Sequence, residues 1–136
     1  MYRILLPVDN DPDRAHDQAA FVAALPATAD DLSVVVTHTL TAEEADAPGD
    51  QRRVGQVETV KLVRDYLSER DIAVELAEAR HPPADGILEL AAEFDADHVA
   101  MGSRKRSPAG KVVFGSVAQQ VLLEADVPVT VVARDD

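Results

Sequence analysis

The sequence contains no cysteine and no tryptophan, and aromatic residues make up only 4% of it. Without cysteine, thiol catalysis, zinc ribbons and a disulfide scaffold are excluded. No apolar run approaches the ~18 residues that a membrane-spanning helix needs, and the first residues lack the basic segment and cleavage site of a secretory signal. We therefore expect a cytoplasmic protein whose residues 1–136 form a single domain around one hydrophobic core.

Positive charge is also scarce, with 13 basic against 25 acidic residues and a formal net charge of −12. Lysine occurs only at Lys61, Lys105 and Lys111. Such a surface repels nucleic acids and anionic membranes, so an anionic ligand would need a locally basic pocket. One hypothesis is a salt-adapted, halophilic protein, whose melting temperature should rise from low to molar KCl as salt screens its carboxylates. An ordinary acidic protein, with equal stability at both salt concentrations, is the alternative.

Hydrophobic patterning predicts five strands that alternate with four helices. The run from Tyr2 to Val8 is typical of a central strand covered on both faces, whereas the two-residue alternation near Val74 indicates an edge strand. An acidic, alanine-rich loop is expected over residues 39–50. The predicted strands span residues 2–8, 32–38, 72–77, 96–101 and 128–133, and the predicted helices span residues 15–25, 51–70, 87–94 and 114–125.

This alternation predicts an α/β, Rossmann-like fold, in which a doubly wound five-stranded parallel sheet of order 3-2-1-4-5 carries helices on both faces. In such sheets ligands bind beyond the carboxyl ends of the strands, where the strand order reverses. Asp9, the segment near His38 and the loop that begins at Gly102 are expected at that edge. His98 begins its strand at the opposite edge, so His38 and His98 are not expected to share a site.

The segment from His98 to Leu123 lacks carboxylates but contains Arg104, Lys105, Arg106 and Lys111. Gly115 and Ser116 open the last predicted helix, where free backbone N–H groups and the helix dipole favour an anion. This combination predicts a phosphate site. The alternative is that these cations are solvated loop charges and that Ser116 only caps the helix.

Two segments resemble the universal stress protein family: VAMGSRKRSPAGKVVFGSVAQQVLLEADVPVTVV over residues 99–132, and ILLPVD over residues 4–9. Members that bind ATP carry a glycine, two residues, a second glycine, nine residues, and then glycine with serine or threonine. Gly102, Gly115 and Ser116 match this motif, but Lys105 replaces the second glycine. A lysine there is strained by about 1 kcal/mol or more if the turn needs a positive φ, or it adds a charge directed at phosphate.

The resemblance implies an adenine-nucleotide-binding stress-response module that is not an enzyme. It implies ATP or AMP, alone or with Mg²⁺, as the ligand. It also implies a homodimer paired through Pro128–Ala133, which charged residues at Val129 and Val131 should disrupt. Asn10 and Asp11 replace the family's glycine and serine after Asp9. The nucleotide-binding residues implied are Val8, Asp9, Val34, Met101, Gly102, Arg104, Lys105, Gly115, Ser116 and Val117, with no metal-ligating and no catalytic residue.

Two alternative functions are a slow ATPase or phosphotransfer enzyme, with Asp9 as its base, and a nucleotide-free dimeric scaffold. Other motifs fail. Asp9, Asp11 and Asp13 lack the glycine and glutamate of a calcium loop. Gly110 and Lys111 lack the remainder of a P-loop, and no dinucleotide fingerprint follows the first strand. The acid and lysine of a receiver domain are missing, and no set of residues suggests a hydrolytic triad.

Overall fold

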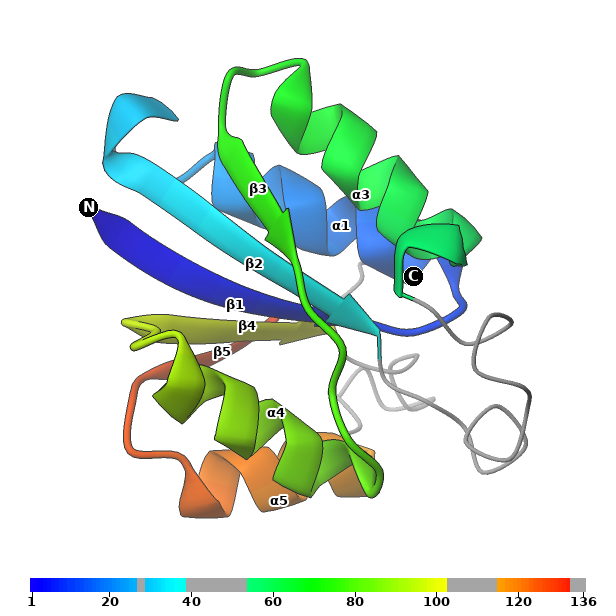
Figure 1. Ribbon diagram of the computed structural model, residues 1–136, viewed down its shortest axis with the longest axis vertical. Coiled ribbons are helices and arrows are strands. Elements are labelled where there is room, and N and C mark those ends of the chain that lie inside the picture. The colour runs from blue at the N-terminus through cyan, green and yellow to red at the C-terminus, as the bar shows by residue number, and fades with distance from the viewer. Residues whose placement is uncertain (27–28, 39–53, 103–114, 133–136) are drawn as a thin grey trace, which may run out of the picture.

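The computed structural model describes residues 1–26, 29–38, 54–102 and 115–132, which form a three-layer α/β fold (Figure 1). Five parallel strands are ordered β3-β2-β1-β4-β5, so the predicted topology is confirmed. Helices α1 and α3 cover one face of the sheet, and α4 and α5 cover the other. The strands are β1 (Tyr2–Val8), β2 (Leu32–His38), β3 (Ala73–Leu76), β4 (His98–Gly102) and β5 (Val129–Val132), and the helices are α1 (Pro12–Ala23), α3 (Glu58–Ser68), α4 (Pro83–Glu93) and α5 (Ser116–Glu124), with 3₁₀ turns at Ala29–Asp31 and Val54–Gln56.

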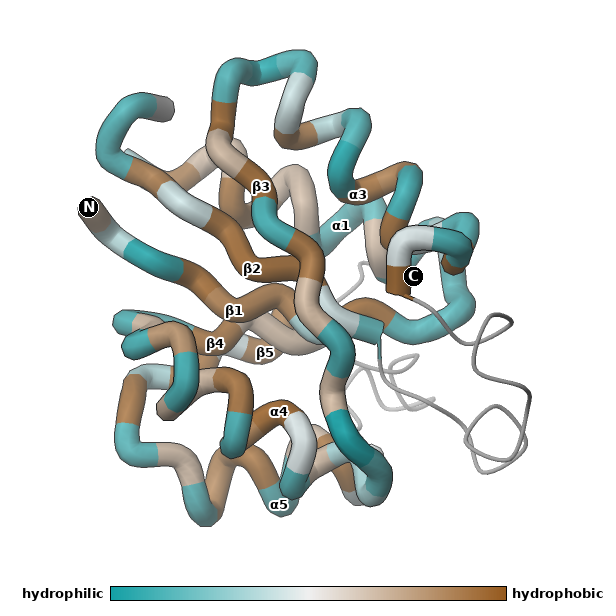
Figure 2. Tube along the Cα trace, viewed as in Figure 1, coloured by the Kyte–Doolittle hydropathy of each residue, from teal (hydrophilic) through white to brown (hydrophobic). Residues whose placement is uncertain are grey.

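Alternation along the central strands divides the core into two layers. Ile4, Leu6 and Val36 pack against α1 and α3, whereas Leu5 and Val35 pack against α4 and α5. Both sets are fully buried, and Figure 2 shows hydrophobic residues concentrated along β1 and β2. The run of apolar residues in each strand is therefore explained by burial on both faces, as the sequence predicts.

The first two predicted strands are confirmed at both ends, but several other boundaries differ. Helix α1 begins at Pro12 rather than residue 15, because the Asp11 side chain caps it by accepting from the Asp13 and Arg14 N–H groups. Strand β4 begins at His98, because Asp95 adopts a positive φ of 50° and the Ala96 N–H still bonds to α4.

Helices α3 and α5 are shorter than predicted, whereas α4 begins at Pro83, before the predicted start at residue 87. Helix α3 begins at Glu58, after a separate 3₁₀ turn. Helix α5 begins at Ser116 and ends at Glu124. The predicted loop over residues 39–50 lies outside the described residues. No helix in the described part of the chain is long and apolar enough to span a membrane.

His38 and His98 lie at opposite edges of the sheet, as predicted, because His38 ends β2 and His98 begins β4. His98 Nε2 lies 2.6 Å from Thr130 Oγ1 on β5, and its Nδ1 lies 2.9 Å from the Tyr2 hydroxyl. Burial lowers the pKa of His98 below its usual value, which favours a neutral imidazole. This histidine therefore joins the edge strand to the sheet and takes no part in the carboxyl-edge site.

Candidate functional site

Strands β1 and β4 separate at the carboxyl edge, where the strand order reverses. Strand β1 pairs with β2 along its whole length, but it pairs with β4 only at Ile4 and Leu5. The Val99 N–H donates to the carbonyl of Pro128, the residue before β5, so by alternation the carbonyl of Ala100 faces β1. The β1 residue that would donate to this carbonyl is Pro7, which has no N–H. Proline thus stops the ladder and opens the two strands.

Gln18 of α1 bridges this separation. Its Nε2 donates to the Pro7 carbonyl at 2.7 Å and to the Ala100 carbonyl at 3.1 Å. The side chain is 1% exposed, so both bonds are shielded from water. The amide replaces backbone pairing and satisfies one carbonyl on each strand while keeping β1 and β4 apart.

Asp9 directly follows β1 and is held by three groups. Its Oδ1 accepts the Asp11 N–H at 3.0 Å, and its Oδ2 forms an ion pair with Arg14. Its backbone carbonyl accepts the Thr59 hydroxyl of α3 at 2.5 Å. These contacts come from two helices and fix both the main chain and the carboxylate of Asp9.

Buried polar groups of β2 lie at the same edge. His38 Nδ1 lies 3.0 Å from the carbonyl of Val8, and His38 is 3% exposed. The neighbouring Thr37 is fully buried, and its Oγ1 has no hydrogen-bond partner among the described residues. Alternation places His38 on the α1/α3 face of β2 and Thr37 on the α4/α5 face. The end of β2 therefore brings polarity to both sides of the sheet.

Gly102, the last residue of β4, lies directly beneath α1. A Cβ at this position would lie 2.6 Å from Arg14 Cδ and 3.0 Å from Gln18 Oε1. Real Cβ atoms do not approach other atoms as closely as the first of these distances, so the Arg14 stem occupies space that only glycine leaves free. Met101, the residue before Gly102, is 5% exposed and packs with the α4/α5 cluster.

Helix α5 begins at the carboxyl edge, because it runs back across the sheet to enter β5. Gly115 is its N-cap residue, with φ −73° and ψ 167°, and no side chain caps the helix. Ser116 is exposed at the first helical position, and Val117 is half-buried. Among the described residues no side chain caps the N-terminal amides of α5, and such amides are suited to an anionic group.

The structure brings most predicted site residues to this edge but does not bring Val34 there. Val34 lies in the middle of β2, opposite Ile4 and Val74, and is fully buried in the α1/α3 core. A side chain in that position supports the sheet and has no access to a ligand. Val8 is buried as well, and only its carbonyl is near the edge. Arg104 and Lys105 lie outside the described residues.

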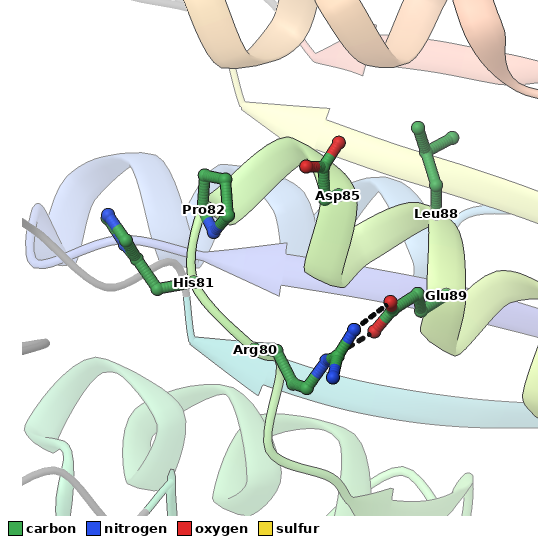
Figure 3. A pocket seen from close by; sticks show the side chains of 6 residues that line it. All are labelled: Arg80, His81, Pro82, Asp85, Leu88 and Glu89. Carbon is green, nitrogen blue, oxygen red and sulfur yellow. Dashed lines mark hydrogen bonds and ion pairs between the residues drawn. The ribbon is translucent and has the colours of Figure 1, made fainter.

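A hollow of about 310 Å³ lies on α4 and the segment before it, away from the carboxyl edge (Figure 3). Figure 3 shows Arg80 and Glu89 meeting in an ion pair, with Nε 2.8 Å from Oε2, while His81 points away from them. Both charges are thus already matched. The described residues contain no cluster of histidine and carboxylate side chains suited to a metal ion. The carboxyl edge remains the better candidate site.

Sequence reasoning missed Arg14, Gln18 and Thr59, although two of them carried a signal. Gln18 lies on the apolar stripe of α1, and a polar residue there indicates a buried hydrogen-bonding role. Arg14 follows the Asp11 cap by three residues, the spacing at which side chains meet on a helix. Thr59 gave no signal, because its contact with Asp9 depends on tertiary packing.

The model of the universal stress protein family matches residues 1–133. A solved universal stress protein from Archaeoglobus fulgidus has a TM-score of 0.76 and 30% identity over 97% of this chain and 98% of its own. A structure of the universal stress protein from Archaeoglobus fulgidus in complex with dAMP has a TM-score of 0.74 and 26% identity at the same coverage. The stress response protein NhaX of Bacillus subtilis is 31% identical over 55% of this chain, a match that spans only 45% of NhaX.

Proposed function

Because the chain belongs to the universal stress protein family, we propose that it is a stress-response module that binds an adenine nucleotide, ATP or AMP, at the carboxyl edge of its sheet. The observation that carries the proposal is the separation of β1 from β4 between Asp9 and Gly102, held by Gln18. A related universal stress protein was solved in complex with dAMP. Both observations favour a nucleotide at the position where doubly wound sheets bind ligands.

In this proposal the two parts of the nucleotide meet different chemistry. Asp9 and the strand ends at Val8 and Met101 face the nucleoside, since a carboxylate accepts hydrogen bonds from ribose hydroxyls. The phosphates lie against Gly102 and the α5 N-terminus at Gly115–Val117, where backbone amides donate. Arg104 and Lys105 add positive charge on sequence grounds. Mg²⁺ can accompany the nucleotide, bound by phosphate oxygens together with water molecules.

We propose binding rather than catalysis because Asp9 is poorly placed to act as a base. Its two carboxylate oxygens accept from the Asp11 N–H and from Arg14, which fixes the carboxylate on the nucleoside side of the proposed site, and its remaining lone pairs can accept from a ribose hydroxyl. A general base must instead reach the proton of the attacking group. Hydrolysis or phosphotransfer by this site would therefore be slow, and a cytoplasmic nucleotide sensor agrees better with the arrangement.

Titration calorimetry with AMP and ATP tests the proposal. We expect saturable binding to the wild-type protein in the micromolar to millimolar range, together with an adenine nucleotide released when freshly purified protein is denatured for mass spectrometry. No heat with either nucleotide, and none released, would favour the nucleotide-free scaffold. Measurable turnover of bound ATP over hours would favour the enzyme.

The proposed assembly is a homodimer paired through Pro128–Ala133. Strand β5 ends the sheet on one side, and its four residues are only half-buried. Because the Val99 N–H donates to the Pro128 carbonyl, alternation directs the amides of Val129 and Val131 away from β4. An edge with outward amides can pair with a second copy of the same strand.

The variant Val131→Pro should give a monomer, because it removes one outward amide and leaves the β4 ladder intact. This substitution tests the interface more specifically than charged residues at Val129 and Val131 would, since Val129 also packs against the α4/α5 core. Light scattering should report the mass of two chains for wild type and of one for the variant. Leu123→Glu, at an 85% exposed position of α5, is the control. A monomeric wild type, or a dimer lost only in the control, would contradict this interface.

A further inference from the structure

The mouth of the candidate site, by which we mean residues 9–14 after β1, is rich in negative charge. Asp9 and Asp11 both direct carboxylate oxygens toward Arg14, and Asp13 follows in the first turn of α1. The formal charge of the whole chain is −12. A phosphate that approaches this mouth would meet like charge at short range, which disfavours binding of an anion.

The Arg14 side chain is packed into this mouth and is mostly shielded from solvent. Its guanidinium forms the ion pair with Asp9, and its Nη2 lies 3.5 Å from Asp11 Oδ2. The side chain is only 17% exposed. The stem lies over Gly102, where a Cβ would lie 2.6 Å from Cδ. The missing Cβ of Gly102 therefore gives space to the stem, and the two aspartates fix the charged end.

Resting on the proposed nucleotide site, we propose that Arg14 determines which ligand charge the site accepts. The guanidinium offsets the Asp9 and Asp11 carboxylates and places positive charge beside the point where β1 and β4 part. Arg14 is thus a specificity-determining residue for phosphorylated ligands. The nucleoside part of the ligand depends on Arg14 only through Asp9, which the Asp11 N–H and the Thr59 hydroxyl also hold in place.

If Arg14 only held Asp9 in place, its loss would change the ligand affinities in a different pattern. Loss of the Asp9 position would weaken every adenine ligand alike, because all of them share the ribose. Loss of a charge weakens each ligand in proportion to its phosphates, and the difference shrinks with salt. Ligand charge therefore separates the two roles.

The test compares wild type with Arg14→Met, which keeps the apolar stem over Gly102 and removes the charge. Calorimetry without Mg²⁺ measures adenosine, AMP, ADP and ATP in low KCl. We expect adenosine affinity to change less than about twofold, AMP affinity to fall about fivefold and ATP affinity to fall more than about tenfold, the size expected for one partly buried charge. Molar KCl should reduce the AMP and ATP differences.

Asp11→Asn supplies the matched rescue, because asparagine is also a good N-cap and the substitution removes one negative charge. In the Arg14→Met background it should restore much of the AMP and ATP affinity while the melting temperature changes little. An equal loss of affinity for all four ligands, or no rescue of affinity by Asp11→Asn, would overturn the proposed role of Arg14 but not the proposed nucleotide site. A wild-type protein that binds none of the four would overturn the proposed function and this inference with it.

Discussion

Gly115→Asp is expected to abolish nucleotide binding and leave the protein folded. Gly115 is the N-cap of α5, where the proposed phosphates meet the first amides of the helix. An aspartate there is itself an excellent N-cap, so its carboxylate would take the amides that a phosphate needs and would repel the phosphate as well. We expect affinity for AMP and ATP to fall at least about 100-fold in calorimetry, a charge effect of roughly 3 kcal/mol.

The same substitution should not lower the melting temperature, because aspartate caps a helix at least as well as glycine. Gly115→Asn is the matched control, since it offers a similar cap without the charge. Its affinity should fall less than that of Gly115→Asp. If the aspartate variant bound ATP as tightly as wild type, the phosphates could not lie at the N-terminus of α5.

Gln18→Leu should destabilise the fold by about 2 to 5 kcal/mol. Leucine has a similar size, but it leaves the Pro7 and Ala100 carbonyls without the amide that bonds both of them. Each buried carbonyl left unpaired costs about 1 to 3 kcal/mol. The midpoint of urea unfolding should fall accordingly, with little change in the slope.

Pro7, whose carbonyl accepts from Gln18, allows a second measurement that isolates the role of the Gln18 amide. In a Pro7→Val background, residue 7 regains an N–H that faces the Ala100 carbonyl, so the ladder between β1 and β4 can extend. The cost of Gln18→Leu should then be smaller than in the wild-type background, and the double-mutant cycle gives the coupling. Equal costs in the two backgrounds would contradict the view that Gln18 replaces the missing backbone bond.

The sequence was sufficient to predict the topology, and the reason is visible in β1 and β2. Strand β1 is a nearly continuous apolar run and β2 is rich in β-branched residues, and the structure buries both of their faces. Strand β3, predicted at the periphery, lies at the edge of the sheet. The boundaries of helices and strands were harder to predict where a capping residue or a positive φ decides them. The Asp11 cap starts α1 early, and the positive φ at Asp95 delays β4, and neither depends on hydrophobic pattern.

The site was only partly predictable from the sequence. Asp9 and Gly102 could be placed because one follows and the other ends a strand, and both strands end at the same edge. The role of Val34 was implied by the resemblance alone, and its place as the third residue of the strand 32–38 keeps it away from the carboxyl edge. The contacts of Arg14 and Thr59 depend on how α1 and α3 pack over that edge, and this packing is set by tertiary structure.

One helix face carries much of this arrangement. Asp11, Arg14 and Gln18 follow each other along α1 and contact the ends of both β1 and β4. A small rotation of α1 would therefore move the cap, the cation and the bridging amide together. Evolution could retune ligand preference in related chains by changing this one short segment, without altering the glycines of the phosphate side. Variation among paralogues would then concentrate in residues 9–18, where sequence comparison can look for it.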